Sequence, residues 1–545
     1  MRFVPVVGTL RRYSNQWFSG DLAAAVTVWA IVVPESMAYA SIAGMPPETG
    51  LYAATIPLLL YAVFGSSNRV TVGPSAAVAA LSFTTVVAFA EVGSEEFVGL
   101  SVLLALIVGV ILVLAGLAKL GVIADFLSEP VLKGFIVGVA MTIALGQLGK
   151  IFGVEVEAEG FFAEALDLIR HIPDLHLETF IVGIVSLAAL FLLERWIPKI
   201  PAALIVVVGS IVAVNWFDLV DAGVHVAGEI PAGLPSFAMP TLSLASIAAL
   251  IPAAIGIAIV VYGESMALAK TFGSKHGERV DANQEMVALG AANSVGGFFG
   301  AFVTTASNSR TAAADTAGQK TQVSSLIVVL LVAVTLLFLT GLFADLPEAA
   351  LGAIVVHAVL GLIRLRPITR LRSRNTVDFW AATATLLGVL VLDVLAGLMI
   401  GVLVSLGGLM ARAVRPRVTW LSWDEDEVRF LDRGKADEKE KAEVSVVRFG
   451  AELFFANVGT LRDAVTEEVM TLQPQVIVLD AEAITQVDTT AADELLKLDT
   501  ELNNQGVHMV FARLDPDVRA AIESGGLALE GRDYPQVADA IAAID

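Results

Sequence analysis

The chain has 545 residues, of which 56% are apolar and 16% are charged, and its mean hydropathy is +0.77. Soluble domains carry about a quarter charged residues, so most of this chain is expected to lie in a membrane. Cysteine is absent, which excludes disulfides and thiolate chemistry, and the six histidines show no metal-ligand spacing, so neither a metal nor a cofactor is expected. From Leu421 onward there are 27 Asp and Glu against 11 Lys and Arg, which argues against nucleic-acid binding by this acidic tail.

Residues 1–20 are basic and carry Trp17 and Phe18, which predicts a cytoplasmic interfacial segment. Apolar runs then follow almost without a break and predict a transmembrane domain over 21–417. A helix needs about 20 apolar residues to cross a bilayer. Fourteen membrane segments are predicted, near 22–40, 51–65, 74–90, 98–118, 130–149, 179–197, 201–217, 244–269, 280–300, 307–318, 324–343, 348–363, 377–392 and 395–413. The third and the tenth are short and polar at their starts, which predicts half-helices.

Lysine and arginine are concentrated in alternate connections between these segments. With a cytoplasmic N-terminus, the inner connections hold Lys199 and the arginine cluster 364–374, among others. The outer connections hold only Lys150 and Arg170 as basic residues, beside acidic stretches such as 155–159. The positive-inside rule therefore predicts a multi-pass protein of the cytoplasmic (inner) membrane with both termini in the cytoplasm.

A short motif occurs twice in the chain. Glu35–Ala40 (ESMAYA) returns as Glu264–Ala269 (ESMALA), each time within or at the end of a long apolar run. About forty residues after each copy, a β-branched stretch gives way to small residues and a new helix, at Val70–Ser75 and at Phe302–Ser307. Matching halves with a carboxylate in an apolar helix and a broken helix downstream are typical of secondary transporters with a midplane binding site. We therefore expect a 7+7 inverted repeat.

The tail has the pattern of a small soluble α/β domain over 444–545, which follows a charged linker over 418–443. Strands are predicted at Val444–Phe449, Leu453–Asn457, Gln475–Leu479 and Val507–Ala512. Helices are predicted at 459–471, 489–504, 515–523 and 535–544.

Several ordered motifs extend over nearly the whole chain: Pro34–Ala40, Pro46–Tyr52, Phe64–Ser67, Val72–Ser75, Asp281–Glu285, Thr304–Thr311 and Ala317–Thr321. In these motifs the chain resembles the SulP family of anion transporters, and its tail resembles a STAS domain. The resemblance implies a uracil-permease-like fold, in which a core domain (segments 1–4 and 8–11) moves in an elevator-like manner against a gate domain (segments 5–7 and 12–14). It also implies a homodimer.

The two half-helices are expected to form the binding site. Their N-termini carry free backbone N–H groups and a partial positive charge, which suit an anion. Ser75 and Ala76 begin one half-helix, and Ser307, Asn308 and Ser309 begin the other. The alternative is that these residues only break and cap the helices. The resemblance assigns Ser75 and Ser309 to substrate contact.

Two charged residues of the second half are candidates for function. Arg310 lies in a small-residue stretch at membrane depth, where it attracts the anion or forms a structural pair with Asp315 or another carboxylate. Glu264 repels an anion unless it is neutralised, and apolar surroundings favour its protonated form. We therefore expect Glu264 to couple transport to a proton, with sodium as the alternative ion and a structural pair with Arg310 as the alternative role.

Further candidates are less specific. Glu35 lines the site, takes part in coupling or pairs structurally. Relatives of the family often carry glutamine at this position, and a hydrogen-bonding amide suits an anion better than a second carboxylate. Tyr39 matches an aromatic wall position of the family, although a tyrosine near a helix end is often an interfacial anchor. In the tail, Asp488 and Thr490 stand where soluble STAS relatives place a phosphorylatable serine loop, but Ala491 replaces the glycine of that loop, which favours an unmodified contact module.

Taken together, these features predict a secondary active transporter for an inorganic oxyanion, sulfate first, by proton symport. A dicarboxylate or bicarbonate symporter is the first alternative, and an anion channel or exchanger is the second. An enzyme is not expected, because no nucleophile–base constellation and no phosphate-binding loop is present in the sequence.

Overall fold

The computed structural model describes residues 5–121, 128–156, 158, 160–197, 201–240, 243–424, 429–433 and 443–543. Parts of several predicted features lie outside these residues: Arg2, Glu157, Glu159, Lys199, the charged run Asp437–Lys441 of the predicted linker, and the last two residues of the tail. The chain divides into two compact units, Met1–Ser405 and Leu406–Asp545, and each is described by itself.

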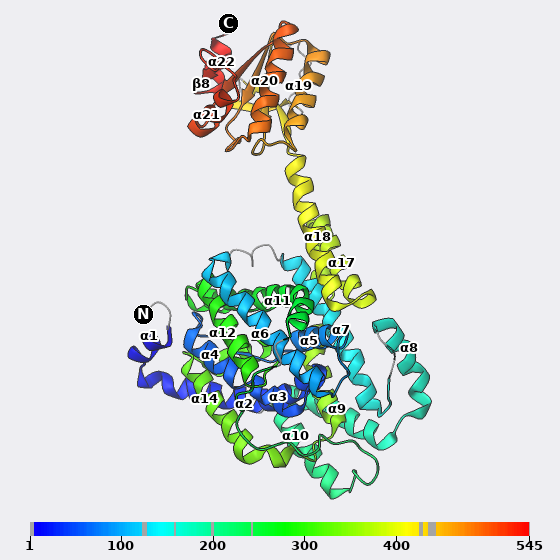
Figure 1. Cartoon of the computed structure of the whole chain (residues 1–545). Coiled ribbons are helices and arrows are strands. Elements are labelled where there is room, and N and C mark those ends of the chain that lie inside the picture. The colour runs from blue at the N-terminus through cyan, green and yellow to red at the C-terminus, as the bar shows by residue number, and fades with distance from the viewer. Residues whose placement is uncertain are drawn as a thin grey trace. The chain divides into compact units, whose positions relative to one another are not determined.

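The first unit is built almost entirely of helices (Figure 1). In its first half these are α1 (Pro5–Arg11), α2 (Asn15–Ile42), α3 (Pro47–Ala53), α4 (Ile56–Phe64), α5 (Ala76–Val86), α6 (Glu95–Leu117), α7 (Glu129–Phe152), α8 (Phe161–His171), η2 (Ile172–Asp174), α9 (Leu177–Trp196) and α10 (Ala202–Trp216). In its second half they are α11 (Leu244–His276), α12 (Ala282–Phe298), α13 (Asn308–Thr316), α14 (Val323–Val334), η3 (Thr335–Leu339), η4 (Thr340–Phe343), α15 (Glu348–Leu360), α16 (Arg366–Arg374), α17 (Thr376–Val391) and the first part of α18 (Val394–Val414), which continues into the second unit.

Each of the fourteen predicted segments coincides with one helix of the structure or with two or three consecutive short ones, as α14, η3 and η4 do for the segment 324–343. Seven helices of the described part are long and apolar enough to cross a membrane. The second segment is divided into α3 and α4, and the first begins earlier than predicted, because α2 starts at Asn15 with Ser14 as its N-cap. The predicted interfacial segment therefore consists largely of α1 and the first turns of α2.

The two predicted half-helices, α5 and α13, are confirmed as short helices of 11 and 9 residues. Each follows a two-residue strand, β1 (Val72–Gly73) or β2 (Thr305–Ala306). The strands pair in antiparallel fashion, with Val72 opposite Ala306 and Gly73 opposite Thr305. β-Branched residues favour this extended backbone, and Pro74 interrupts the chain between β1 and α5. The ladder brings the starts of the two half-helices together.

The helices pack as two sets that match the expected core and gate. In the first set, α12 lies against α6 and α4, and α2 contacts α13 and α14; in the second, α7 packs against α15, α17 and α9. Glycines allow the close approach of these helices. A Cβ added at Gly290 of α12 would lie 2.7 Å from the carbonyl oxygen of Gly109 of α6, and one at Gly134 of α7 would lie 2.1 Å from that of Ala382 of α17.

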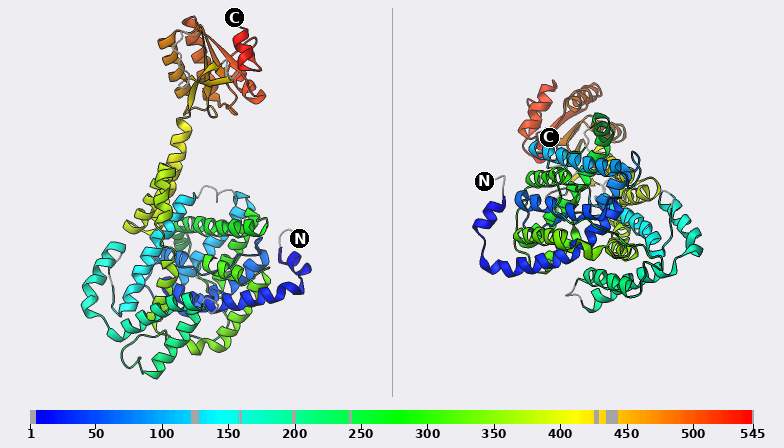
Figure 2. Two further views of the ribbon diagram at one scale, coloured as in Figure 1. Left: turned by 180° about the vertical axis from the view of Figure 1, so that it is seen from behind. Right: turned by 60° about the horizontal axis from the view of Figure 1, so that its bottom comes forward.

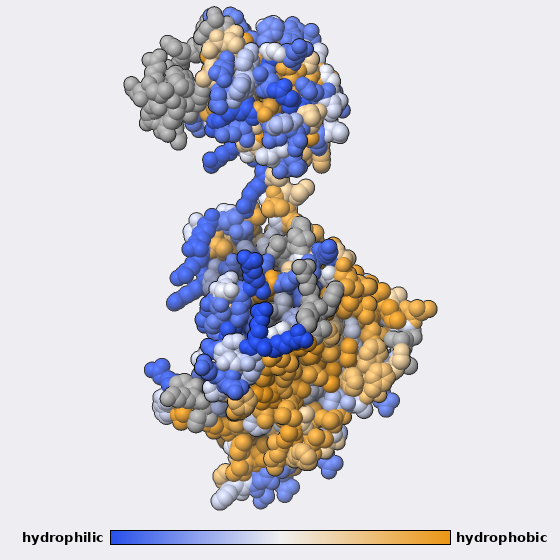
Figure 3. Space-filling model, turned by 90° about the vertical axis from the view of Figure 1, so that its left-hand side faces the viewer, coloured by the Kyte–Doolittle hydropathy of each residue, from blue (hydrophilic) through white to orange (hydrophobic). Residues whose placement is uncertain are grey.

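The surface of the first unit is that of a membrane protein. Figure 3 shows a broad apolar surface on this unit. Large apolar side chains, among them Leu330, Phe338 and Leu342, are exposed. The amphipathic helix α8 lies at the periphery of this unit (Figure 1), and the cyan and teal part of the chain is seen at an outer edge in both views of Figure 2. Contact of this apolar surface with lipid is favourable, whereas its exposure to water would drive association with other molecules.

The second unit contains a six-stranded sheet with the order β4-β3-β5-β6-β7-β8. Its elements are β3 (Val418–Asp424), β4 (Arg429–Asp432), β5 (Val444–Phe449), α19 (Val458–Leu472), β6 (Val476–Asp480), α20 (Thr489–Asn504), β7 (His508–Ala512), α21 (Pro516–Ser524), β8 (Asp533–Tyr534) and α22 (Val537–Ala542). Strands β5 to β8 are parallel, and β3 is antiparallel to both β4 and β5. Apolar side chains fill one core with α19, α20 and α21 and a smaller one with α22.

Two expectations for the tail differ from the structure. The predicted strand Leu453–Asn457 is wrong: only Leu453 forms a single bridge to Val487, and the segment is otherwise a turn that leads into α19. Asn457 fixes this turn by accepting a hydrogen bond from the amide of Phe454 at 2.9 Å. The predicted linker also contains β3 and β4, so the sheet starts inside it.

Candidate functional site

A cavity of about 480 Å³ lies at the starts of the two half-helices. Seven of the nine residues predicted to act in transport line it: Tyr39, Ser75, Ala76, Glu264, Ser307, Asn308 and Ser309. The structure therefore brings together residues from four separate stretches of the sequence. The opposite wall is apolar and comes from α7 and α15, with Phe135, Val139 and Val359 among its side chains.

The two helix starts differ in their caps. Ser75 is the N-cap of α5 with extended backbone, and its buried hydroxyl has no hydrogen-bond partner among the described residues. Ser307 is the N-cap of α13, where its hydroxyl accepts from the amide of Arg310 at 3.4 Å and lies 3.2 Å from the hydroxyl of Ser309. The amides of the first turn of each helix have no intrahelical acceptor. Both starts therefore present donors and a partial positive charge to the cavity.

The antiparallel ladder fixes this geometry. The amide of Ser307 donates to the carbonyl oxygen of Thr71 at 2.9 Å, and the amide of Thr71 donates to the hydroxyl of Thr311 at 3.1 Å. Ser265, which follows Glu264, accepts from the amide of Ala306 at 3.1 Å and contacts the hydroxyl of Thr305 at 3.0 Å. The repeated motif thus ties α11 to β2 and sets the position of Glu264.

Arg310 does not line the cavity. Its side chain is completely buried, and one guanidinium nitrogen donates to the carbonyl oxygen of Pro74. A Cβ added at Gly73 would lie 2.9 Å from Nη1 of Arg310, so this close approach requires glycine. Nε and Nη1 have no hydrogen-bond partner within the described part of the chain. The guanidinium therefore places a positive charge where the two half-helices begin, without facing the cavity.

The pairing of Arg310 with Asp315, one of the structural alternatives, is not what the structure contains. Asp315 accepts from Nζ of Lys275 and lies against Nε2 of His276, both at 2.6 Å, at the C-terminal end of α11. Among the described residues no carboxylate forms an ion pair with Arg310, and Glu35 is the carboxylate whose charge is close enough to act on it. Arg310 and Asp315 stand at i,i+5 positions, and side chains with this spacing point to different sides of a helix.

Glu35 lines a second cavity, of about 1050 Å³, instead of the first. Ser309 lines both cavities, so the start of α13 separates them. The second cavity also contains His357 of α15, whose Nε2 lies 3.0 Å from a carboxylate oxygen of Glu194 in α9. One oxygen of Glu35 is buried without a hydrogen-bond partner among the residues that the structure describes.

Glu264 is the carboxylate of the first cavity. One of its oxygens is buried, and no hydrogen-bond partner for it exists in the described ranges. The alternative of an ion pair with Arg310 is not observed between these two described residues. An ionised carboxylate with no cationic partner repels an anion bound beside it. Binding of the anion is therefore favourable only when this carboxylate is neutralised.

The apolar wall of the first cavity was not found from the sequence. Leu132, Phe135, Ile136 and Val139 belong to α7, whose apolar residues are spread around the helix, so periodicity does not separate cavity-facing from lipid-facing residues.

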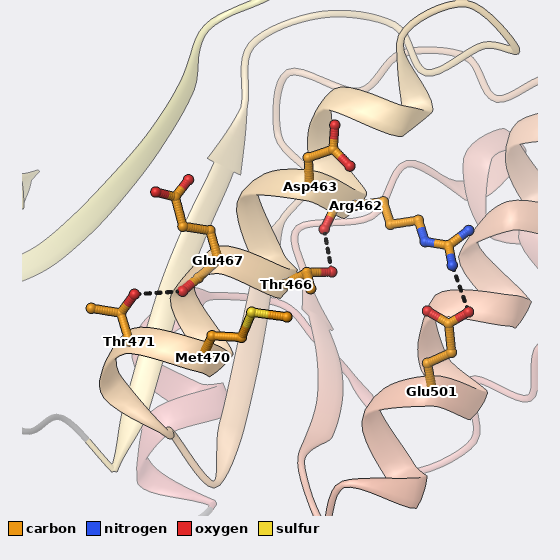
Figure 4. Close-up of a pocket in the computed structure, with 7 residues that line it drawn as sticks. All are labelled: Arg462, Asp463, Thr466, Glu467, Met470, Thr471 and Glu501. Atoms are coloured by element: carbon orange, nitrogen blue, oxygen red, sulfur yellow. Dashed lines mark hydrogen bonds and ion pairs between the residues drawn. The ribbon is translucent and has the colours of Figure 1, made fainter.

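In the second unit, Asp488 is the N-cap of α20 and accepts from the amide of Ala491 at 2.7 Å and from that of Phe455 at 2.9 Å. Thr490 is exposed in the first turn of this helix. A shallow hollow lies beside α19, where Arg462 points toward Glu501 of α20 and bonds it at 2.6 Å (Figure 4). Ion pairs of this kind are common on solvated surfaces and contribute little to stability.

The inverted repeat, the paired strands and the opposed half-helices define a polytopic membrane transport protein, not an enzyme. Residues 18–385 match the sulfate permease family, and residues 435–540 match the STAS domain. The chain therefore belongs to the sulfate permease (SulP) family and carries a C-terminal STAS domain.

Named relatives cover most of the chain. A Mycobacterium tuberculosis protein named as a probable sulfate transporter is 37% identical over 528 residues, which is 96% of this chain and 94% of that protein. The chloroplastic sulfate transporter 4.1 of Arabidopsis thaliana is 29% identical, over 98% of this chain and 82% of its own length. Among solved structures, the murine solute carrier 26 member A9 anion transporter in its inward-facing state has a TM-score of 0.93 at 26% identity, covering 99% and 94% of the two chains. The transmembrane domain of a cyanobacterial bicarbonate transporter has a TM-score of 0.62 at 19% identity and shares the fold over 72% of this chain.

Proposed function

We propose that this protein carries an inorganic oxyanion, sulfate first, across the cytoplasmic membrane by secondary active transport coupled to protons. The observation that carries the proposal is the pair of half-helix starts, α5 and α13, which are joined by the β1–β2 ladder and open into one cavity. The names of the relatives support sulfate as the cargo.

In this proposal the anion is held mainly by the main chain. Free amides at the starts of α5 and α13 donate to its oxygens, and the hydroxyls of Ser75 and Ser309 add further donors. Arg310 acts at a distance, because its buried charge adds to the positive potential of both helix starts without contacting the anion. The apolar wall from α7 and α15 limits access of water to the site.

Coupling is assigned to Glu264. An ionised carboxylate in the cavity repels the anion, whereas a protonated one removes the repulsion and donates a hydrogen bond. Binding of the proton and of the anion then favour each other, which is a coupling free energy between two sites. Sodium remains the alternative ion, and its binding would neutralise the same carboxylate.

Movement is proposed to be elevator-like, with the core sliding against the gate. The cavity walls include Thr271 of α11 and Leu362 after α15, and those of the second cavity include Thr27 of α2, all near predicted cytoplasmic helix ends. These positions favour an inward-facing state. On the predicted outer side, Nζ of Lys150 in the gate donates to the hydroxyl of Ser41 in the core at 3.1 Å.

Four further features of the protein remain predictions. They are the cytoplasmic location of both termini, a homodimer, the domain limits given above, and a regulatory role of Asp488 and Thr490.

The test is uptake of radiolabelled sulfate into proteoliposomes that contain the purified full-length protein. With an imposed pH gradient we expect accumulation above equilibrium, which a protonophore abolishes. Accumulation driven by a sodium gradient alone would show that the coupling ion is sodium and not the proton. Mere equilibration would favour the channel or exchanger, and uptake of fumarate or bicarbonate without sulfate would contradict the assignment of the cargo.

A further inference from the structure

A hollow of about 520 Å³ lies on the first unit away from both cavities. It is formed by α1, the residues before and at the start of α2, the loop after α4, the connection between α11 and α12, and the loop that joins α13 to α14. Three basic side chains from separate parts of the chain line it, Arg12, Arg69 and Lys320, together with Trp17 and Glu278.

The charges in this hollow do not cancel. Nε of Arg69 bonds Glu278 at 2.9 Å, and another of its nitrogens donates to the carbonyl oxygen of Gln319, so this arginine and this acid satisfy each other. Arg12 and Lys320 are exposed, and neither forms an ion pair with a described residue. Two cations are therefore available to a ligand.

The carboxylate of Asp21, which binds the loop of Lys320, does not compete for them. Asp21 is completely buried and accepts from the amides of Lys320 and Thr321 at 2.7 and 3.0 Å and from the hydroxyl of Thr321 at 2.7 Å. Tyr13 donates to it as well, at 3.1 Å. Asp21 thus binds backbone amides and a hydroxyl of the loop and holds the loop in place. The ammonium group of Lys320 takes no part in these bonds.

Apolar side chains next to the hollow are exposed on the surface of the first unit. Val7 and Leu10 of α1 and Phe18 and Leu22 of α2 are exposed, with Leu10 at 52% and Phe18 at 49%. An indole such as that of Trp17 is favoured at the headgroup level of a bilayer. Exposed apolar groups beside a basic hollow suit a ligand with an anionic head and hydrocarbon chains.

We propose that this hollow, the Arg12–Lys320 site, binds the phosphate of an anionic phospholipid in the cytoplasmic leaflet. The placement in that leaflet rests on the proposed topology, whereas binding itself does not depend on transport. The phosphate lies between the guanidinium of Arg12 and the ammonium of Lys320, and the acyl chains lie along the apolar residues of α1 and α2.

The site adjoins the second half-helix. The loop of Lys320 follows directly on α13, and the amide of Gln319 donates to the carbonyl oxygen of Ala314 in that helix at 3.0 Å. A lipid held by Lys320 therefore braces the C-terminal end of α13. We expect an anionic lipid to stabilise the protein and to support the transport that α13 serves.

The experiment measures lipid binding to the full-length protein in a mild detergent through the shift in melting temperature. The probes are dioctanoyl phosphatidylglycerol, dioctanoyl phosphatidylcholine and inorganic phosphate. The variants are Arg12→Gln and Lys320→Gln, with Arg372→Gln as the control, because it removes the same charge from an exposed position of α16. Each site variant is expected to weaken phosphatidylglycerol binding about fivefold, as for one basic residue near an anionic lipid surface.

Stronger binding of phosphatidylglycerol than of phosphatidylcholine, lost in both site variants and kept in Arg372→Gln, supports the site. An equal loss in Arg372→Gln would reduce the effect to general charge attraction and overturn the proposal. Equal stabilisation by inorganic phosphate would make the ligand a free phosphate instead of a lipid. Lipid binding that persists in a protein without sulfate uptake would leave this site standing while the proposed function fails.

Discussion

The guanidinium of Arg310 donates to the carbonyl oxygen of Pro74 and so joins the second half of the repeat to the first where the two half-helices begin. This bond, together with the β1–β2 ladder, makes the two helix starts one rigid structure with a shared positive charge. An arginine in this position shapes the site through its packing and its field, and direct contact with the cargo is not needed for either.

Substitution of Gly73 tests this role. In Gly73→Ala the new Cβ would lie 2.9 Å from Nη1 of Arg310, so the guanidinium has to move. Overpacking of this kind costs about 1–3 kcal/mol, and we expect sulfate uptake to fall about tenfold together with a lower melting temperature. Gly99→Ala is the matched control, because a Cβ at Gly99 meets no atom within 4 Å. Unchanged uptake in Gly73→Ala would show that the position of Arg310 does not matter.

Glu264→Gln tests the coupling. Glutamine resembles the protonated carboxylic acid but does not titrate, so accumulation driven by a pH gradient is expected to disappear while sulfate counterflow continues. The measurement is uptake into proteoliposomes at several external pH values. Glu129→Gln, which removes an exposed carboxylate paired with Lys133, should keep the pH dependence. If the pH dependence of Glu264→Gln equals that of the unmodified protein, the proton is carried elsewhere.

Lys150→Ala tests the outer contact between core and gate. Loss of the bond from Lys150 to Ser41 removes a hydrogen bond to a charged group, worth about 1.5–3 kcal/mol, and should favour an outward-open state about tenfold. Since the chain has no cysteine, Ser309→Cys provides a single label in the site. We expect its labelling by a membrane-impermeant maleimide from outside to rise in the Lys150→Ala background and not in Lys133→Ala. No increase would mean that this bond does not hold the outer side closed.

Glu164, which lies outside the membrane segments, is expected to make the stability of the protein depend on pH. Burial of this α8 carboxylate raises its pKa from 4.5 to about 7, and a Cβ at Gly146 of α7 would lie 3.2 Å from it. The folded state therefore favours the protonated form, so its contribution to stability is complete below pH 4.5 and is lost as pH rises through 7. The melting temperature should fall more between pH 5 and 8 in the unmodified protein than in Glu164→Gln. The exposed Glu229→Gln should behave like the unmodified protein, and parallel pH profiles for all three would contradict the prediction.

The location of each membrane segment and of both half-helices was predictable, because these features depend on local properties. Apolar length identifies a crossing, and Pro74 and the small polar residues around Ser307 end one helix and begin the next. The strand in β3 was missed although Val418–Asp424 alternates, because its position after a membrane segment made it resemble a charged connection.

The amino-acid sequence by itself determined that this chain lies in a membrane, repeats itself and places small donors at two helix starts. Only the tertiary structure decided that Glu264 faces one cavity, Glu35 faces another, and Arg310 faces neither. The reason is that hydropathy and capping act along the chain, whereas the side to which a buried residue points depends on how each helix is rotated about its axis. That rotation is set by close helix contacts such as Gly109 against Gly290.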